Sequence, residues 1–161
     1  MILTITLSLS SIQDFINALS NESNQTSKHS NDMTAMKMII ERGDIAMGFN
    51  QSAIAHQFLA TLDGDKIIIT ALNASDRQTI DQIKNHIRDI QKDFSEGNFT
   101  KPFFIHAQEV PGTNVMTQKK DLIEYNILEI KNGSTLMLTT NDTQLVDAIN
   151  QFMEFQAGQH Q

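Results

Sequence analysis

The sequence predicts an α+β fold, a two-layer sandwich in which two long helices pack on one face of an antiparallel sheet. Two segments show the apolar–polar alternation of paired strands, and each folds back at a turn sequence, Asp63-Gly64 or Asn132-Gly133. Each hairpin is followed by a segment whose apolar residues recur every three or four positions, as in an amphipathic helix. A hairpin with one apolar face is unstable alone, so the two units are expected to share a core.

In the first unit, alternation predicts a strand over residues 44–49, with Ile45, Met47 and Phe49 on one face. Residues 56–62 and 66–72 are the expected hairpin around Asp63-Gly64. Asp76 or Ser75 can cap the following helix, and Gly97 can end it. The apolar stripe of this helix consists of Ile80, Ile83, Ile87, Ile90 and Phe94.

The second unit repeats this order, with strands expected at residues 123–127 and 135–139. Asn141 or Asp142 can cap a helix that carries Leu145, Val146, Ile149, Phe152 and Met153. A shift of 69 positions places Gly64 on Gly133, and a shift of 66 places Asp76 on Asp142. We interpret the chain as a duplication, with repeats at about 44–97 and 113–157. Between them, residues 101–108 are expected to form a further strand, followed by a turn at Val110-Pro111-Gly112.

The N-terminal region has a separate character. Residues 1–10 are apolar and short, which is typical of a signal-peptide core whose basic start is missing, or of an alternating strand. Residues 20–32 contain no apolar side chain and are expected to form a disordered linker. We therefore predict a signal-like segment and linker over residues 1–32 and one domain over residues 33–161.

Export is also favoured by the frequency of Asn-x-Ser/Thr triplets, which are glycan acceptors in exported proteins. The alternative is that asparagine and Ser/Thr simply share turns. We expect an extracellular, periplasmic or cell-surface location, with a cytoplasmic location as the alternative. The seven triplets begin at Asn21, Asn24, Asn50, Asn73, Asn98, Asn132 and Asn141.

Composition limits the classes of function. The 161 residues carry a net charge of −7 with 12 Lys and Arg, and no basic stripe is present, so nucleic-acid binding is not expected. The absence of cysteine excludes disulfides, thiol catalysis and cysteine-ligated metals. No apolar run has the length of a membrane-spanning helix.

Histidines are the main candidate site residues. His56, His86 and His106, together with Tyr125, are the polar groups expected in a cleft between the two units. The alternative is that these histidines are half-buried packing residues. None shows the spacing of metal ligands, and the repeat aligns His86 with Phe152. A further alternative is a transition-metal site formed by His56, His86 and His106.

A second metal hypothesis concerns copper. Met33, Met36 and Met38 follow His29, and thioethers with an imidazole can bind copper(I). Methionines that enter a core are far commoner. No nucleophile elbow, glycine-rich phosphate loop, His-Glu-x-x-His sequence or calcium loop occurs, so no catalytic residues are predicted.

Several strings resemble a family of small, mostly exported bacterial and archaeal proteins without a known mechanism, some of them labelled aspartate carbamoyltransferase. The resemblance covers about residues 42–160. The chain lacks the Ser-Thr-Arg-Thr phosphate-binding stretch of true transcarbamoylases, so that activity is not implied. Where this chain has His56-Gln57, the family pattern has two consecutive histidines, and where this chain has Asn150, the pattern has a histidine. These differences weaken the hypothesis of a histidine metal site here. The matching strings are Met47-Gly48-Phe49-Asn50-Gln51, His56-Gln57-Phe58, Asp81 to Ile87, Phe94 to Phe99, His106, Val110-Pro111-Gly112, Val115-Met116 and Phe152 to Gln156.

These observations predict an exported binding or interaction domain that is not an enzyme and holds no cofactor. Its partner would be a small molecule or a protein, and a homodimer is an open alternative. The competing hypothesis is a histidine-based metal protein, with copper as one candidate, or a metal-dependent enzyme.

Overall fold

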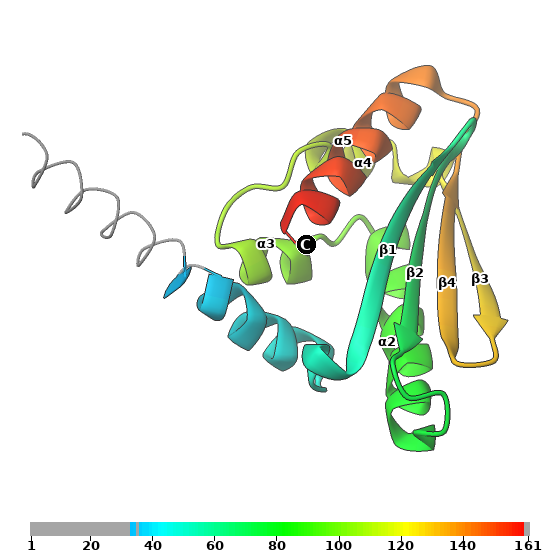
Figure 1. Ribbon diagram of the computed structural model, residues 1–161. Helices are drawn as coiled ribbons and strands as arrows, with labels where there is room; N and C mark the ends of the chain where they lie inside the picture. Colours follow the sequence, from blue (N-terminus) through cyan, green and yellow to red (C-terminus); the bar gives the residue numbers. More distant parts are fainter. Residues whose placement is uncertain (1–32, 35, 160–161) are drawn as a thin grey trace, which may run out of the picture. The chain divides into compact units, whose positions relative to one another are not determined.

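The computed structural model describes residues 33–34 and 36–159 (Figure 1). The signal-like segment and the linker predicted over residues 1–32 lie outside this part of the chain. The chain divides into two units after residue 39, and the described part of the first unit is residues 33–34 and 36–39. The second unit is an α+β domain with a four-stranded antiparallel sheet, as the sequence predicts.

The strands of this sheet are β1 (Ile54–Thr61), β2 (Gly64–Ala71), β3 (Glu124–Ile130) and β4 (Gly133–Thr139). Their order is β1-β2-β4-β3, and all neighbours are antiparallel. The two predicted hairpins are therefore present, and they join along β2 and β4 in the middle of the sheet.

Both hairpins turn one residue earlier than predicted. Thr61 pairs with Gly64, so the first loop consists of residues 62–63. Ile130 pairs with Gly133, so the second loop consists of residues 131–132. The glycines are thus the first residues of the returning strands.

A steric reason explains why glycine follows each loop. A Cβ atom on Gly64 would lie 2.0 Å from the backbone oxygen of Leu138, and one on Gly133 would lie 2.0 Å from that of Ile69. Gly64 also has a φ angle of 145°, which residues with a side chain rarely adopt. Each glycine therefore allows the two hairpins to approach closely.

Two long helices cover the inward face of the strands. The helix α2 (Arg77–Ser95) contacts β2, β3 and β4, whereas α5 (Thr143–Gln159) contacts β1 and β2 (Figure 1). The predicted cap of α2 is confirmed, since Asp76 Oδ1 accepts a hydrogen bond from the Thr79 backbone N–H at 3.1 Å. The whole predicted stripe of α2 is buried.

The cap predicted for α5 is likewise confirmed. Asp142 Oδ1 accepts hydrogen bonds from the backbone N–H groups of Gln144 and Leu145, at 2.9 and 3.2 Å. The carboxylate therefore satisfies donors that the first helical turn leaves without a partner.

The strand predicted over residues 44–49 is wrong. Residues 40–47 are helical, and Gly48 ends this helix with a φ angle of 76° and a hydrogen bond from its N–H to Asp44 O at 2.9 Å. Three apolar residues at every second position are too few to distinguish a strand from a short helix. Gly48 was the better signal, because glycine with positive φ commonly follows a helix. The 3₁₀ turn η1 (Gln51–Ala53) then leads into β1.

The strand predicted over residues 101–108 is also wrong. This segment contains α3 (Thr100–His106), followed by α4 (Thr113–Gln118) and the 3₁₀ turn η2 (Lys120–Leu122). Pro102 lies in the first turn of α3, where no backbone N–H is needed. Asn98 Oδ1 accepts from the backbone N–H of Thr100 at 3.0 Å, a start signal that the apolar run concealed.

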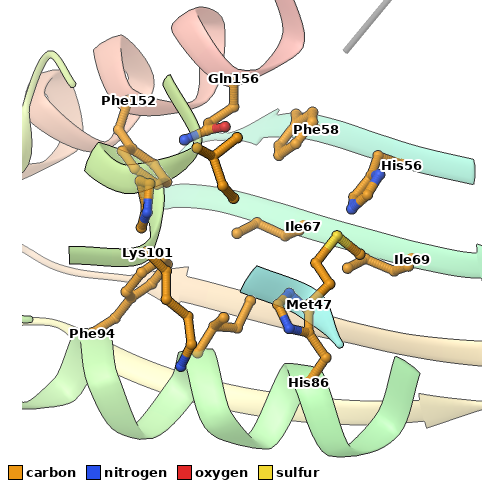
Figure 2. Close-up of a pocket in the computed structure, with 13 residues that line it drawn as sticks. Met47, His56, Phe58, Ile67, Ile69, His86, Phe94, Lys101, Phe152 and Gln156 are labelled. Atoms are coloured by element: carbon orange, nitrogen blue, oxygen red, sulfur yellow. The ribbon is translucent and has the colours of Figure 1, made fainter. Parts of the chain in front are cut away.

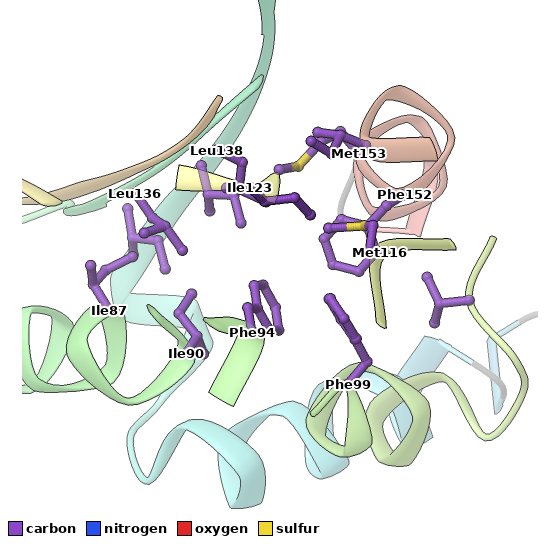
Figure 3. Packing of buried hydrophobic residues seen from close by; sticks show 14 of the residues in the cluster. Ile87, Ile90, Phe94, Phe99, Met116, Ile123, Leu136, Leu138, Phe152 and Met153 are labelled. Atoms are coloured by element: carbon purple, nitrogen blue, oxygen red, sulfur yellow. The ribbon is translucent and has the colours of Figure 1, made fainter. Parts of the chain in front are cut away.

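The core joins the sheet to all of these helices. Figure 3 shows three phenylalanines packed together: Phe94 of α2, Phe152 of α5, and Phe99, which directly precedes α3. Their ring centroids are 4.6 to 5.8 Å apart. Leu136 and Leu138 of β4 meet this group from the sheet and are fully buried. Aromatic packing thus fixes the positions of the helices that surround the candidate site.

Candidate ligand-binding pocket

A mostly apolar pocket lies between the inward face of β1 and β2 and the helices α2, α3 and α5. We call it the histidine pocket, and its cavity volume is about 60 Å³. Its accessible edge is formed by the half-buried lining residues Met47, His56, Phe58, His86, Lys101 and Ile105. Its lining residues are Met47, His56, Phe58, Ile67, Ile69, His86, Ile90, Phe94, Lys101, Pro102, Ile105, Phe152 and Gln156.

Two of the four predicted site residues, His56 and His86, line this pocket from different elements. His56 is on β1, where it pairs with Ile69 and stacks on Phe58 at a centroid distance of 6.1 Å. His86 is on α2, beside the buried stripe, with its ring edge-on to Phe49 at 5.9 Å. Figure 2 shows Met47 at the same end of the pocket as both imidazoles.

His86 is a neutral imidazole at physiological pH. Burial lowers its pKa to about 4, and the Lys101 ammonium contributes in the same direction, whereas Asp89 and Asp93 oppose the shift. A neutral imidazole has one donor and one acceptor nitrogen. His86 can therefore offer a ligand one hydrogen bond of either kind without a charge.

The opposite end of the pocket carries Lys101 with Phe94 and Phe152 (Figure 2). The Lys101 ammonium forms an ion pair with Asp93 of α2. Because a carboxylate already compensates this charge, the pocket has no uncompensated cation at this end. A ligand with a full negative charge is thus not favoured here.

His106 does not line the histidine pocket but contacts one of its lining residues. It is buried on α3, and its Nε2 hydrogen-bonds the amide oxygen of Gln156, a lining residue, at 2.9 Å. The ring lies edge-on to Phe155 at 5.0 Å. Burial lowers the pKa of His106, and the bond to Gln156 partly opposes this effect. His106 thus fixes the Gln156 side chain.

Tyr125 lies apart from the pocket. It is on β3, half-buried against the core, and its hydroxyl has no hydrogen-bonding partner among residues 33–34 and 36–159. Burial raises the pKa of its phenol above the ordinary value. The structure therefore separates Tyr125 from the two pocket histidines.

The described part of the chain contains no group of three or more His, Asp or Glu side chains placed to hold a metal ion. Only His56 and His86 of the three predicted ligands share a cavity. Met33, Met36 and Met38 of the copper hypothesis have exposed side chains, and His29 lies outside the described residues.

The pocket also contains residues that the sequence did not single out. Met47 was placed on a strand, and Lys101 and Ile105 were placed on another, whereas all three are helical. Ile105 follows Lys101 by four positions and Pro102 by three, and this spacing could have indicated one face of a helix. Gln156 had a signal of its own, since it is one turn from Phe152 and Met153 on the buried side of α5.

Comparison with known proteins adds no relative: no family model, curated protein or solved structure matches the chain. Among the described residues, no helix combines the length and the apolar character that crossing a bilayer requires.

Proposed function

We propose that the protein is a binding domain, and that the histidine pocket takes a small, uncharged and largely apolar molecule with one hydrogen-bonding group. The observation that carries this proposal is the convergence of His56 and His86, from opposite walls, on a cavity lined mainly by aliphatic and aromatic side chains. Ligand sites in proteins commonly combine such a lining with a few polar groups that orient the ligand.

Electrostatics supports an uncharged ligand. The pKa of His86 is lowered to about 4, so its imidazole carries no charge at neutral pH. The Lys101 ammonium is already paired with Asp93. Burying a charged group without a partner is costly, so a neutral ligand fits this pocket better than an ion.

A binding experiment tests the proposal. Isobutanol and benzyl alcohol are titrated into the protein and followed by saturation-transfer NMR. Ile105→Trp, which places a larger side chain at the accessible edge, should abolish the transfer to both probes. Phe104→Trp makes a similar change at the neighbouring position of α3, which is exposed and does not line the pocket, and it should retain the wild-type transfer.

Equal transfer in the wild type and in Ile105→Trp would contradict the proposal, provided that the variant keeps the wild-type amide spectrum. Loss in both tryptophan variants would also contradict it, because the effect would then not belong to the pocket.

Histidine-based metal binding is the second candidate function. Its support is that imidazoles of His56 and His86 line one cavity, which gives two potential ligands. Elemental analysis after mild purification tests it: a stoichiometric metal that His56→Ala or His86→Ala removes would favour this candidate over the apolar ligand.

We also propose that the protein is exported, on the basis of the apolar N-terminal segment and the seven Asn-x-Ser/Thr triplets. The triplets have a structural role as well. The side-chain oxygens of Asn50, Asn73 and Asn98 accept hydrogen bonds from the backbone N–H two residues later, at 2.8 to 3.0 Å. Turn formation therefore accounts for part of their frequency.

Finally, we propose that the domain is a two-layer sandwich that arose by duplication. Ile67 pairs with Leu136, its counterpart at a shift of 69, at the middle of the β2–β4 ladder. Gly64 and Gly133 approach the backbone of Leu138 and Ile69, which are related by the same shift. Each helix contacts the hairpin of the other half, with α2 on β3 and β4 and α5 on β1. A two-fold relation between the halves accounts for all three features.

A further inference from the structure

A second cavity lies on the other side of Phe58, between the strands β1 and β2 and the helix α5. We call it the acidic cavity; it has a volume of about 250 Å³. Phe58 lines both the acidic cavity and the histidine pocket. The polar groups of the acidic cavity are Thr61 of β1, Asp65 of β2, and Asn150 and Glu154, which are one turn apart on one face of α5.

Asp65 of β2 is the most unusual group in this cavity. Its side chain is 1% exposed, and neither carboxylate oxygen has a well-formed hydrogen bond in the described part of the chain. The backbone N–H of Thr61 is near enough to lower the pKa of the carboxyl, but its effect is smaller than the effect of burial. Asp65 occupies the same face of β2 as Ile67 and Ile69, and α5 packs against that face. The carboxylate is therefore directed toward the helix residues that line the cavity.

Asn150 and Glu154 offer further hydrogen-bond acceptors to the cavity. The Oδ1 atom of Asn150 is buried and has no partner among the described residues. Glu154 lies at the rim with an exposed side chain. The hydroxyl of Thr61 already donates within its own hairpin, where its Oγ1 is 2.9 Å from Gly64 O and 3.1 Å from Asp63 Oδ1.

No lysine, arginine or histidine lines this cavity, so Asp65 and Glu154 are its two titratable groups. A buried carboxylate without a partner is costly and is seldom kept for packing alone. The missing component is a cation that donates several hydrogen bonds.

We infer that the acidic cavity is a second binding site, and that its ligand is a primary organic ammonium ion. The ammonium supplies three donors for Asp65, Asn150 and Glu154. Phe58 and Met153 supply apolar contact for the carbon chain that carries it, and an aromatic face also attracts cations. A bare metal ion fits less well, because the described residues offer no set of three His, Asp or Glu ligands.

Entry of the ligand requires a small rearrangement. The Asp65 oxygens are buried from solvent, so a lining side chain must move before an ammonium can reach them. Glu154 at the rim and the flexible thioether of Met153 are the side chains best suited to this movement. The same burial raises the pKa of the Asp65 carboxyl to about 6.

The test is a titration with n-butylammonium chloride, followed by the methyl NMR signals of Met153 and Ala157. These two residues line the acidic cavity and do not line the histidine pocket, so the result does not depend on the first proposal. We expect saturable shifts of both signals. 1-Butanol, the neutral counterpart, should not shift them at the same concentrations.

Three variants assign the binding to the cavity. Asp65→Asn should weaken butylammonium binding at least about tenfold, since a buried charged hydrogen bond is lost. Glu154→Gln should weaken it by about two- to fivefold, as expected for an exposed charge. Asp147→Asn removes the same charge from an exposed position of α5 outside the cavity and should change the affinity by less than about twofold.

Three results would overturn the inference. One is binding by Asp65→Asn, with a native amide spectrum, within twofold of wild type. Another is an equal response to 1-butanol. The third is displacement of butylammonium by calcium or magnesium chloride at matched ionic strength, which would make the cavity a metal site. If Asp65→Asn fails to fold, Glu154→Gln takes its place, because Glu154 is exposed and its replacement should not disturb folding. Wild-type affinity in Glu154→Gln would then overturn the inference.

Discussion

Asp65 and His86 are both shifted by burial, in opposite directions. Burial raises the pKa of the Asp65 carboxyl to about 6; the Glu154 carboxylate adds to this, whereas the nearby backbone N–H of Thr61 opposes it. Burial lowers the pKa of His86 to about 4. Each group is therefore neutral over part of the range in which it would be charged in the unfolded chain, so each makes the stability depend on pH.

For Asp65, the folded state binds its proton more tightly than the unfolded chain does. As the pH rises from about 4 to about 6, the unfolded chain loses this proton first, and the free energy of unfolding falls. Asp65→Asn should remove this dependence and raise the free energy of unfolding at pH 7 by up to about 3 kcal/mol. Urea unfolding between pH 4 and 7 measures both effects, and a less stable variant at pH 7 would contradict them.

For His86, the unfolded chain binds the proton more tightly. As the pH falls from about 6.5 to about 4, the unfolded imidazole becomes charged while the folded one does not, so the free energy of unfolding falls by up to about 3 kcal/mol. His86→Leu should reduce this loss, and His106, whose pKa is also lowered, accounts for a remainder of the same sign. The same urea titrations measure it; an unchanged acid dependence in His86→Leu would refute the assignment.

These residue-level properties could not be predicted from the sequence. Asp65 follows the Asp63-Gly64 turn signal and resembles an ordinary exposed turn residue in the sequence. Its burial depends on α5, whose contact with β2 joins residues more than seventy positions apart. His56 and His86 were predicted to share a cleft, but His106 and Tyr125 were predicted there as well. Only the helix–sheet packing shows which of the four line the pocket.

At the level of secondary-structure elements, the close approach of the two hairpins depends on one glycine in each. Gly64→Ala and Gly133→Ala would each place a methyl group 2.0 Å from a backbone oxygen of the other hairpin. We expect each variant to lower the free energy of unfolding by at least about 2 kcal/mol, since neither backbone can move freely. Chemical denaturation provides the measurement.

Gly158→Ala is the matched control, because nothing lies within 4 Å of its added methyl group. In the exposed end of α5, this change should stabilise the helix by up to about 1 kcal/mol. A similar loss of stability in all three alanine variants would show that the close approach is not the cause.

The predicted elements succeeded where a local signal was strong and failed where it was short. The α2 stripe from Ile80 to Phe94 extends over four turns and was located correctly together with its Asp76 cap. In contrast, the alternation over residues 44–49 and the apolar run over residues 101–108 are too short to distinguish a strand from a helix. Both segments contribute to the histidine pocket, so their misassignment concealed part of its lining.

At the level of the whole molecule, we propose that differences between two duplicated halves give rise to the two cavities that Phe58 lines. On this proposal, the cavities lie where the two halves differ, as at His86 and Phe152, which a shift of 66 relates and which both line the histidine pocket. The sequence predicted both hairpins and both long helices, but the cavities between them depend on three-dimensional packing.

Methyl NMR of the isoleucine-labelled protein, titrated with benzyl alcohol, tests the central claim most directly. The histidine pocket should bind the probe, so the signals of Ile67, Ile69, Ile90 and Ile105 should shift together and saturate. Ile130, on the far strand β3, should not respond. Shifts distributed over all isoleucines, or an unchanged spectrum at probe saturation, would show that this pocket is a packing defect and not a binding site.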